Sequence, residues 1–294
     1  AREICGCIFQ GGVRMLGKLI KHEWKAVWKV PALLLGILMI IAAVAGLTFA
    51  LPIWDSDWIG LPMSGIMLIM MFYVAMIGVS LGIVIYLAVR YFKNMFTDEG
   101  YLTHTLPVTS RQLLISKVMI MSVWELLSSI GVLFSMVVFG GVAVFSLASK
   151  EGDFASLVIE AMKGLGNLWD MPFFKDFQIF GVSTVFMELV SCFSGAMIII
   201  ASITMGQMIR KHRVLGSVGA YFAINAVIQG IFMVIMFPMT IKMALDNAFL
   251  YRFETSPFSF YTIMFTIMSV VYLAVGVGLY FLSEYLLHKQ LELE

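Results

Sequence analysis

The chain has 294 residues, of which 61% are hydrophobic and only 13% are charged, and its mean hydropathy is +0.97. Globular proteins are about 45–50% apolar and about 25% charged, so this composition excludes an ordinary soluble domain. The formal net charge of +1 gives no reason to expect a nucleic-acid partner.

Six long apolar stretches account for this composition. Each is longer than the roughly 20 residues that cross a bilayer core as a helix, and a barrel strand needs only about 9–11. We therefore expect an all-α polytopic membrane protein with six transmembrane helices. Gly78 and Gly82, in the second stretch, fit the small-xxx-small pattern of close helix packing, which we expect within the bundle; a dimer interface is the alternative. The predicted spans are 30–54, 59–89, 118–148, 179–209, 214–241 and 258–287.

Residues 1–14 precede the first methionine, Met15. The codons for Gln10, Gly11 and Gly12 can read as a ribosome-binding sequence at a bacterial spacing from the Met15 codon. We therefore expect translation to start at Met15 and residues 1–14 to be a non-native leader. The alternative is a genuine short N-terminal tail.

Residues 15–29 are predicted to form a helix that lies in the membrane surface. Its lysines recur at spacings of three and four, so they share one face, and aliphatic residues fill much of the remainder. Trp24 and Trp28 suit the aromatic belt of the interface and would act as anchors there. A basic flank that only sets topology is a compatible interpretation. The lysines are Lys18, Lys21, Lys25 and Lys29.

Residues 90–117 connect the second and third spans and are too long for a simple turn. Thr97, followed by two acids, can cap a short helix. Pro107 breaks the chain, and the pattern from Thr109 to Gln112 fits a capping box. We therefore expect two helical pieces that form a compact knuckle, with the third helix beginning near Ser110.

The distribution of charge predicts the orientation. From Met15 onward, 12 of the 17 Lys and Arg lie in the N-terminal segment, the connections after spans 2 and 4, and the tail. The other connections hold five, together with nine acidic residues. By the positive-inside rule, both termini and the 90–117 connection are expected in the cytoplasm. Two cytoplasmic ends agree with an even number of spans.

Three acidic residues lie within the spans: Glu125, Glu188 and Glu284. A charge at mid-bilayer is costly, so such residues point to function. Glu125 and Glu188 are candidates for a substrate path, each about two turns into its span. The simpler interpretation is a carboxyl group that hydrogen-bonds neighbouring helices. Glu284 lies close to the end of its span and is expected at the interface.

The sequence predicts no catalytic site, metal site or cofactor of its own. Zinc and nucleophile motifs are absent from it, and the four histidines are scattered. The letters from Gly12 to Lys18 spell G-x-x-x-x-G-K, but Leu19 stands where a P-loop needs Ser or Thr, and no strand precedes it. We therefore expect no nucleotide site in this chain.

Three segments carry a resemblance to a known family. The connection RYFKNMFTDEGYLTHTLPVTSRQLLISK is similar to the corresponding segment of bacterial type-2 ABC transporter permeases. The opening MLGKLIKHEWKAVWKV and the closing LLHKQLELE resemble the two ends of the same permeases. The similarity runs from Met15 to the tail and is specific in these three places.

The resemblance implies a permease subunit of an ABC exporter in the bacterial cytoplasmic membrane. It implies that residues 15–29 are the elbow helix of that family. It also implies a separate ATPase subunit that binds and hydrolyses ATP, so the permease is not itself an enzyme. Two permeases, identical or different, would complete the transporter. The implied ATPase-coupling residues are Thr97, Asp98, Glu99, Gly100, Tyr101, Leu102 and Pro107.

Two other functions stay open. An ion-gradient-driven secondary transporter would need no partner and would use Glu125 or Glu188 as a proton carrier. A membrane sensor or immunity protein would bind a peptide through residues 149–178 and transport nothing. The sequence does not name a substrate.

Overall fold

The structure is a computed structural model that describes residues 17, 19–51, 60–97, 110–151, 159, 163, 174–209, 212–245 and 257–291. These residues are almost entirely helical and include no strand. Six of the helices are long and apolar enough to cross a membrane. The prediction of an all-α chain with six membrane-spanning helices is confirmed at this level.

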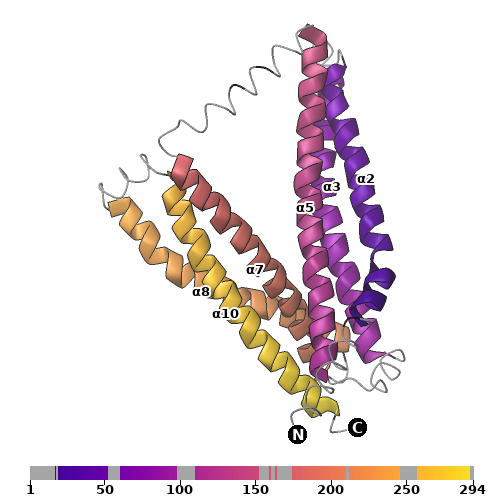
Figure 1. Ribbon diagram of the computed structural model, residues 1–294, viewed down its shortest axis with the longest axis vertical. Helices are drawn as coiled ribbons and strands as arrows, with labels where there is room; N and C mark the ends of the chain where they lie inside the picture. Colours follow the sequence, from indigo (N-terminus) through magenta and orange to yellow (C-terminus); the bar gives the residue numbers. More distant parts are fainter. Residues whose placement is uncertain are drawn as a thin grey trace, which may run out of the picture. The chain divides into compact units, whose positions relative to one another are not determined.

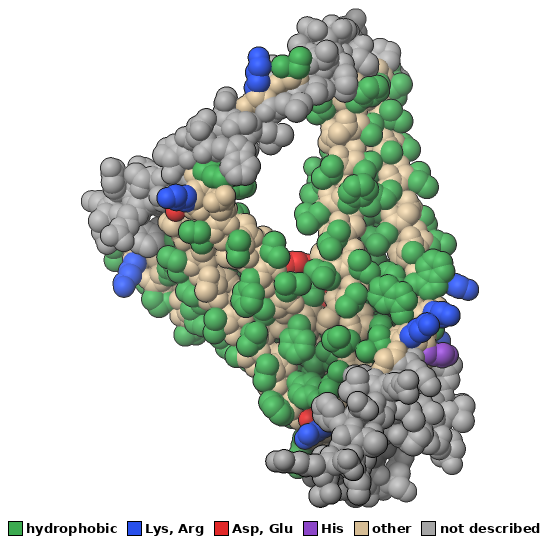
Figure 2. Space-filling view, in the orientation of Figure 1, with side chains coloured by type: hydrophobic (Ala, Val, Ile, Leu, Met, Phe, Trp, Pro, Cys, Tyr) green, Lys and Arg blue, Asp and Glu red, His purple; other side chains and the backbone are tan. Residues whose placement is uncertain are grey.

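The six long helices follow one another along the chain, and a 3-10 turn ends the first (Figure 1). Their apolar side chains are largely exposed on the protein, as in Leu33, Met233 and Val234, which suits contact with lipid. Figure 2 shows hydrophobic side chains along the helices and Lys and Arg near their ends. The helices are α2 (Lys29–Leu47) with η1 (Thr48–Ala50), α3 (Gly60–Phe96), α5 (Ser110–Glu151), α7 (Phe174–Gly206), α8 (Arg213–Leu245) and α10 (Pro257–Leu291).

The first helix ends earlier than the predicted span, which ran to residue 54. Leu51 is already extended, with φ −77° and ψ 145°. It precedes Pro52, whose ring disfavours the helical conformation in the residue before it. The third helix, α5, begins at Ser110, as the capping box predicted.

α3 and α5 are longer than a bilayer requires. α3 has 37 residues and α5 has 42, so at 1.5 Å per residue they measure about 55 and 63 Å. The bilayer core is only about 30 Å thick. The last turns of α3 and the first turns of α5 carry Arg90, Lys93, Arg111 and Lys117. Charged residues avoid hydrocarbon, and both helices are long enough to carry these charged turns outside a bilayer core.

The chain divides into two compact units. Unit 1 contains Ala1–Glu23, Ala88–Val123 and Pro172–Glu294, so it holds α7, α8, α10 and the ends of α3 and α5 that flank residues 98–109. Unit 2 contains Trp24–Leu87 and Trp124–Met171, so it holds α2 and the remainder of α3 and α5.

Unit 2 packs around Phe139 of α5. The Phe139 ring stacks on Phe72 of α3, with ring centroids 4.9 Å apart, and meets Phe49 edge-on at 6.3 Å. A Cβ atom added to Gly46 of α2 would lie 2.8 Å from the Phe139 carbonyl oxygen, a distance that real Cβ contacts essentially never show. Gly46 therefore allows α2 and α5 to approach more closely than any larger residue would.

The small-xxx-small pair in α3 makes no such close approach. A Cβ atom on Gly82 would lie 3.7 Å from Leu34, an ordinary van der Waals contact, and one on Gly78 would meet no atom within 4 Å. Within one chain, close packing of unit 2 therefore occurs at Gly46 and not at this pair, because spacing alone does not say which face a neighbouring helix covers.

Unit 1 is held together by the pairing of α7 with α10. The Ser194 hydroxyl of α7 donates to the Tyr272 carbonyl oxygen of α10 at 2.7 Å. A Cβ atom on Gly276 would lie 2.8 Å from the Ser194 hydroxyl oxygen, so this glycine allows the contact. One turn earlier, the Ser269 hydroxyl lies 3.4 Å from the Met187 sulfur. A small residue and hydroxyl groups at a helix contact are typical of helices that pack within a membrane.

The N-terminal part of the described chain is helical over residues 19–27, with a turn at Trp28 before α2. Trp28 keeps helical dihedral angles, and its N–H donates to the Trp24 carbonyl oxygen at 3.2 Å. Pro31 has no N–H to donate to the Val27 carbonyl, which explains an interruption at this point. The placement of residues 15–29 at a membrane surface stays a prediction.

Candidate functional site

Most of the residues predicted to couple to an ATPase lie outside the described residues. Thr97 is described: it is exposed, follows α3 directly, and its hydroxyl donates to the Lys93 carbonyl oxygen. The others lie between the end of α3 and the start of α5. They are Asp98, Glu99, Gly100, Tyr101, Leu102 and Pro107.

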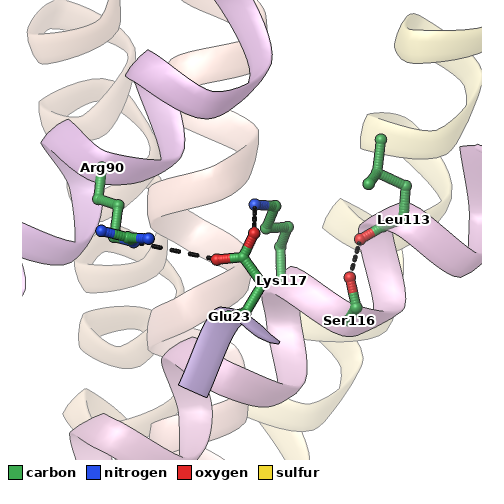
Figure 3. A network of polar contacts seen from close by, with 5 residues as sticks. All are labelled: Glu23, Arg90, Leu113, Ser116 and Lys117. Carbon is green, nitrogen blue, oxygen red and sulfur yellow. Dashed lines mark hydrogen bonds and ion pairs between the residues drawn. The ribbon is translucent and has the colours of Figure 1, made fainter. Parts of the chain in front are cut away.

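A cluster of three charged side chains lies at the helix ends that flank this segment. Glu23 comes from the helical segment 19–27, Arg90 from α3 and Lys117 from α5, and all three belong to unit 1. One carboxylate oxygen of Glu23 accepts a hydrogen bond from the Lys117 ammonium group, and the other lies 3.9 Å from Arg90 Nε. In Figure 3 the Glu23 carboxylate lies between the two cations. We call this set the Glu23 cluster.

The burial of the Glu23 cluster makes it energetically important. The side chains of Lys117 and Glu23 are 6% and 13% exposed, while that of Arg90 is 26% exposed. The distance of 3.9 Å is too long for a hydrogen bond, so the contribution of Arg90 Nε is a coulombic attraction. A buried charge is costly unless it is paired, so each of these groups depends on the others.

The polar side chain next to Lys117 is hydrogen-bonded within its own helix. Ser116, next to Lys117, is buried, and its hydroxyl donates to the Leu113 carbonyl oxygen at 2.7 Å (Figure 3). Its polar group is therefore satisfied within α5 and does not compete for the Glu23 carboxylate. The Glu23 cluster joins the helical segment 19–27, α3 and α5 through its ion pairs.

A second ion pair ties the start of α5 to the end of α10. Arg111 Nε donates to a carboxylate oxygen of Glu284, and both residues belong to unit 1. The Arg111 side chain is 72% exposed, so water screens this pair far more than the Glu23 cluster. Glu284 was predicted only as an interfacial acid, and its cationic partner was not foreseen.

The two contacts tie the end of α3 and the start of α5, the helix ends on either side of residues 98–109, to other helices. Arg90 lies seven residues before Thr97, and Arg111 and Lys117 lie in the first turns of α5. The chain therefore enters and leaves residues 98–109 from helix ends that are tied to its N-terminal segment and to α10.

Glu188 lies near the middle of α7. It is residue 15 of the 33 in α7, about 21 Å along the axis from Phe174. It is half-buried, and the thiol of Cys192, one turn later, lies 3.6 Å from its carboxylate. A carboxyl group at the middle of an apolar helix fits either a substrate path or a local hydrogen-bonding role.

Glu125 lies in unit 2 and is also half-buried. Its neighbour Trp124 is buried and stacks on Trp24, with ring centroids 4.9 Å apart and planes at 22°. Trp24 therefore packs against the protein and is also partly exposed, and Trp28 is about half exposed. The anchoring role predicted for both tryptophans stays a prediction.

Glu23 is the residue that the sequence interpretation missed. It is the one acid in the segment from Lys18 to Lys29, and it falls on the side of that helix opposite Lys21 and Lys25. A lone acid on the apolar side of a basic amphipathic helix is a signal that could have been used, because such a group needs a cation from another element.

The described residues contain no group of three or more His, Cys, Asp or Glu side chains that could hold a metal ion. A scan against protein-family models and searches of curated proteins and of solved structures gave no match to this chain.

Proposed function

We propose that this chain is the permease subunit of an ABC exporter and that residues 90–117 couple it to a separate ATPase subunit. The observation that carries the proposal is the anchoring of that connection on both sides by the Glu23 cluster and the Arg111–Glu284 pair. A segment that receives force from an ATPase must be tied to the helices that move. The resemblance of its sequence to type-2 permeases supports the same function.

The lengths of α3 and α5 support this assignment. Both helices are long enough to continue beyond the bilayer core at the ends that carry the connection. A soluble subunit could therefore reach residues 98–109 without entering the headgroup layer. In this proposal the partner binds ATP, and a second permease copy, identical or different, completes the transporter.

The proposed topology places the connection and both termini in the cytoplasm. In a chain whose three native cysteines are replaced by serine, we expect Lys93→Cys to be protected from an impermeant thiol reagent in intact cells. Lys175→Cys and Lys242→Cys should react, because they lie at the opposite helix ends and all three lysines are exposed. Permeabilised cells are the control. Labelling of position 93, but not of 175, in intact cells would contradict the topology.

ATP dependence separates the proposal from a proton-driven transporter. Vesicles that contain this chain and its ATPase can be incubated with an extract of the native host, and the accumulated compounds can be identified by mass spectrometry. We expect accumulation with ATP and none with a non-hydrolysable analogue. Gln keeps the shape and hydrogen bonding of Glu but cannot release a proton, so Glu125→Gln and Glu188→Gln should stay within about twofold of the wild type.

The same assay can instead support a proton-driven secondary transporter. Vesicles that contain this chain alone, under an imposed pH gradient, should accumulate nothing. The control variant is Gln229→Asn, which changes an exposed amide in α8. If the wild type and this control accumulate compounds under the gradient and Glu188→Gln does not, the chain is a secondary transporter and the ABC proposal is wrong.

A further inference from the structure

The helical segment that carries Glu23 has two chemically different sides. Leu19, Glu23 and Val27 recur at intervals of four residues and occupy one side, where Val27 and Glu23 are largely covered by protein. Lys21 and Lys25 are one turn apart on another side, and both are exposed. The spacing of a helix places such residues about 5–6 Å apart along its axis.

In the part of the chain that the structure describes, no acid forms an ion pair with the lysines of this segment. The one carboxylate of the segment, that of Glu23, is engaged by Lys117 and Arg90. Among the residues that the structure describes, the ion pairs are those two and Arg111–Glu284, so none involves Lys21, Lys25 or Lys29. Three exposed ammonium groups in succession, without an ion pair to a described residue, create an attraction for anions.

Aromatic side chains accompany these lysines. Trp24 and Trp28 are both partly exposed and stand one turn apart, next to Lys25 and Lys29 in the sequence. Tryptophan prefers the headgroup level of a bilayer, where its ring is partly apolar and its N–H is solvated. Lysines and tryptophans on one short segment match a surface that offers anionic groups above hydrocarbon.

We propose that Lys21, Lys25 and Lys29 bind the headgroups of anionic phospholipids, so that this segment recognises lipid charge and does not only rest on the membrane. Phosphate oxygens accept charge-assisted hydrogen bonds from ammonium groups, and juxtamembrane lysines gain further from the negative potential of an anionic leaflet. The proposal does not depend on the presence of an ATPase partner.

Native mass spectrometry of the purified chain with equimolar phosphatidylglycerol and phosphatidylcholine tests this proposal. We expect the wild type to retain phosphatidylglycerol preferentially. Removing three lysine charges should weaken that retention about tenfold or more in the K21Q/K25Q/K29Q variant. The matched control, K163Q/K175Q/K242Q, loses the same charge at three other exposed lysines and should retain the lipid.

Two further measurements keep the test decisive if the glutamine variant inserts poorly. The charge-preserving K21R/K25R/K29R variant should retain phosphatidylglycerol, and raising the salt concentration should release it from the wild type but not release phosphatidylcholine. The proposal would be overturned if both glutamine variants lost phosphatidylglycerol equally, or if K21Q/K25Q/K29Q retained it. It would also be overturned if the arginine variant lost this lipid or if the wild type retained it at high salt.

Discussion

Replacing Glu23 by Gln is expected to lower the free energy of unfolding by about 3 kcal/mol, because it leaves two largely buried cations without their carboxylate. This value is at the lower end of the stability losses found when one partner of a buried ion pair is removed, because Arg90 is 26% exposed. Lys117, at 6% exposed, should account for most of the loss. Unfolding of the purified chain by denaturant in detergent micelles measures the change.

A second replacement distinguishes the ion pair from a packing defect. In E23Q/K117Q both buried charges are gone, so at least half of the lost stability should return, as a double-mutant cycle would show. Glu284→Gln is the matched control, because it breaks an ion pair of which one member is mostly exposed, and it should cost much less. Equal losses in Glu23→Gln and Glu284→Gln would contradict the importance assigned to the cluster.

The second large effect is expected in the coupling segment itself. Replacing Tyr101 and Leu102 together by Ala should abolish stimulation of the ATPase by the permease while leaving the chain inserted. Asp98 and Glu99 can make charge-assisted bonds, and an aromatic or aliphatic anchor supplies most of the energy of a small interface. Two such truncations should weaken binding of the partner by about thirtyfold or more.

ATP hydrolysis by the reconstituted complex, measured against permease concentration, checks this expectation. The matched control removes the same two residue types at Tyr285 and Leu282, which are exposed on α10. That variant should stimulate the ATPase normally. Normal stimulation by the Tyr101→Ala/Leu102→Ala variant would remove this segment from the proposed interface.

Sequence alone could predict the helices because the constraint that forms them is local. A backbone in lipid must satisfy its own hydrogen bonds, so an apolar stretch of sufficient length becomes a helix whatever surrounds it. The start of α5 at Ser110 was predictable for the same reason, since a capping box acts within four residues. The early end of the first helix could also have been predicted, because Leu51 precedes Pro52.

The contacts between helices could not be predicted in this way. Glu23 and Lys117 are 94 residues apart in the chain, and neither has a local feature that names the other. Gly46, which permits the close approach of α2 to α5, looks like any other glycine in a span, whereas the regular pair Gly78 and Gly82 does not support one. Such contacts depend on which faces meet, and that is a property of the folded chain.

The central claim, that this chain works with a separate ATPase, is tested most directly by purification from the native host. The affinity-tagged chain, isolated in mild detergent with magnesium and ATP, should bring with it a nucleotide-hydrolysing subunit in comparable amount. The Tyr101→Ala/Leu102→Ala variant should lose that subunit, and the Tyr285→Ala/Leu282→Ala variant should keep it. Isolation of the wild-type chain from membranes in which it is active, without any ATP-hydrolysing partner, would contradict the claim.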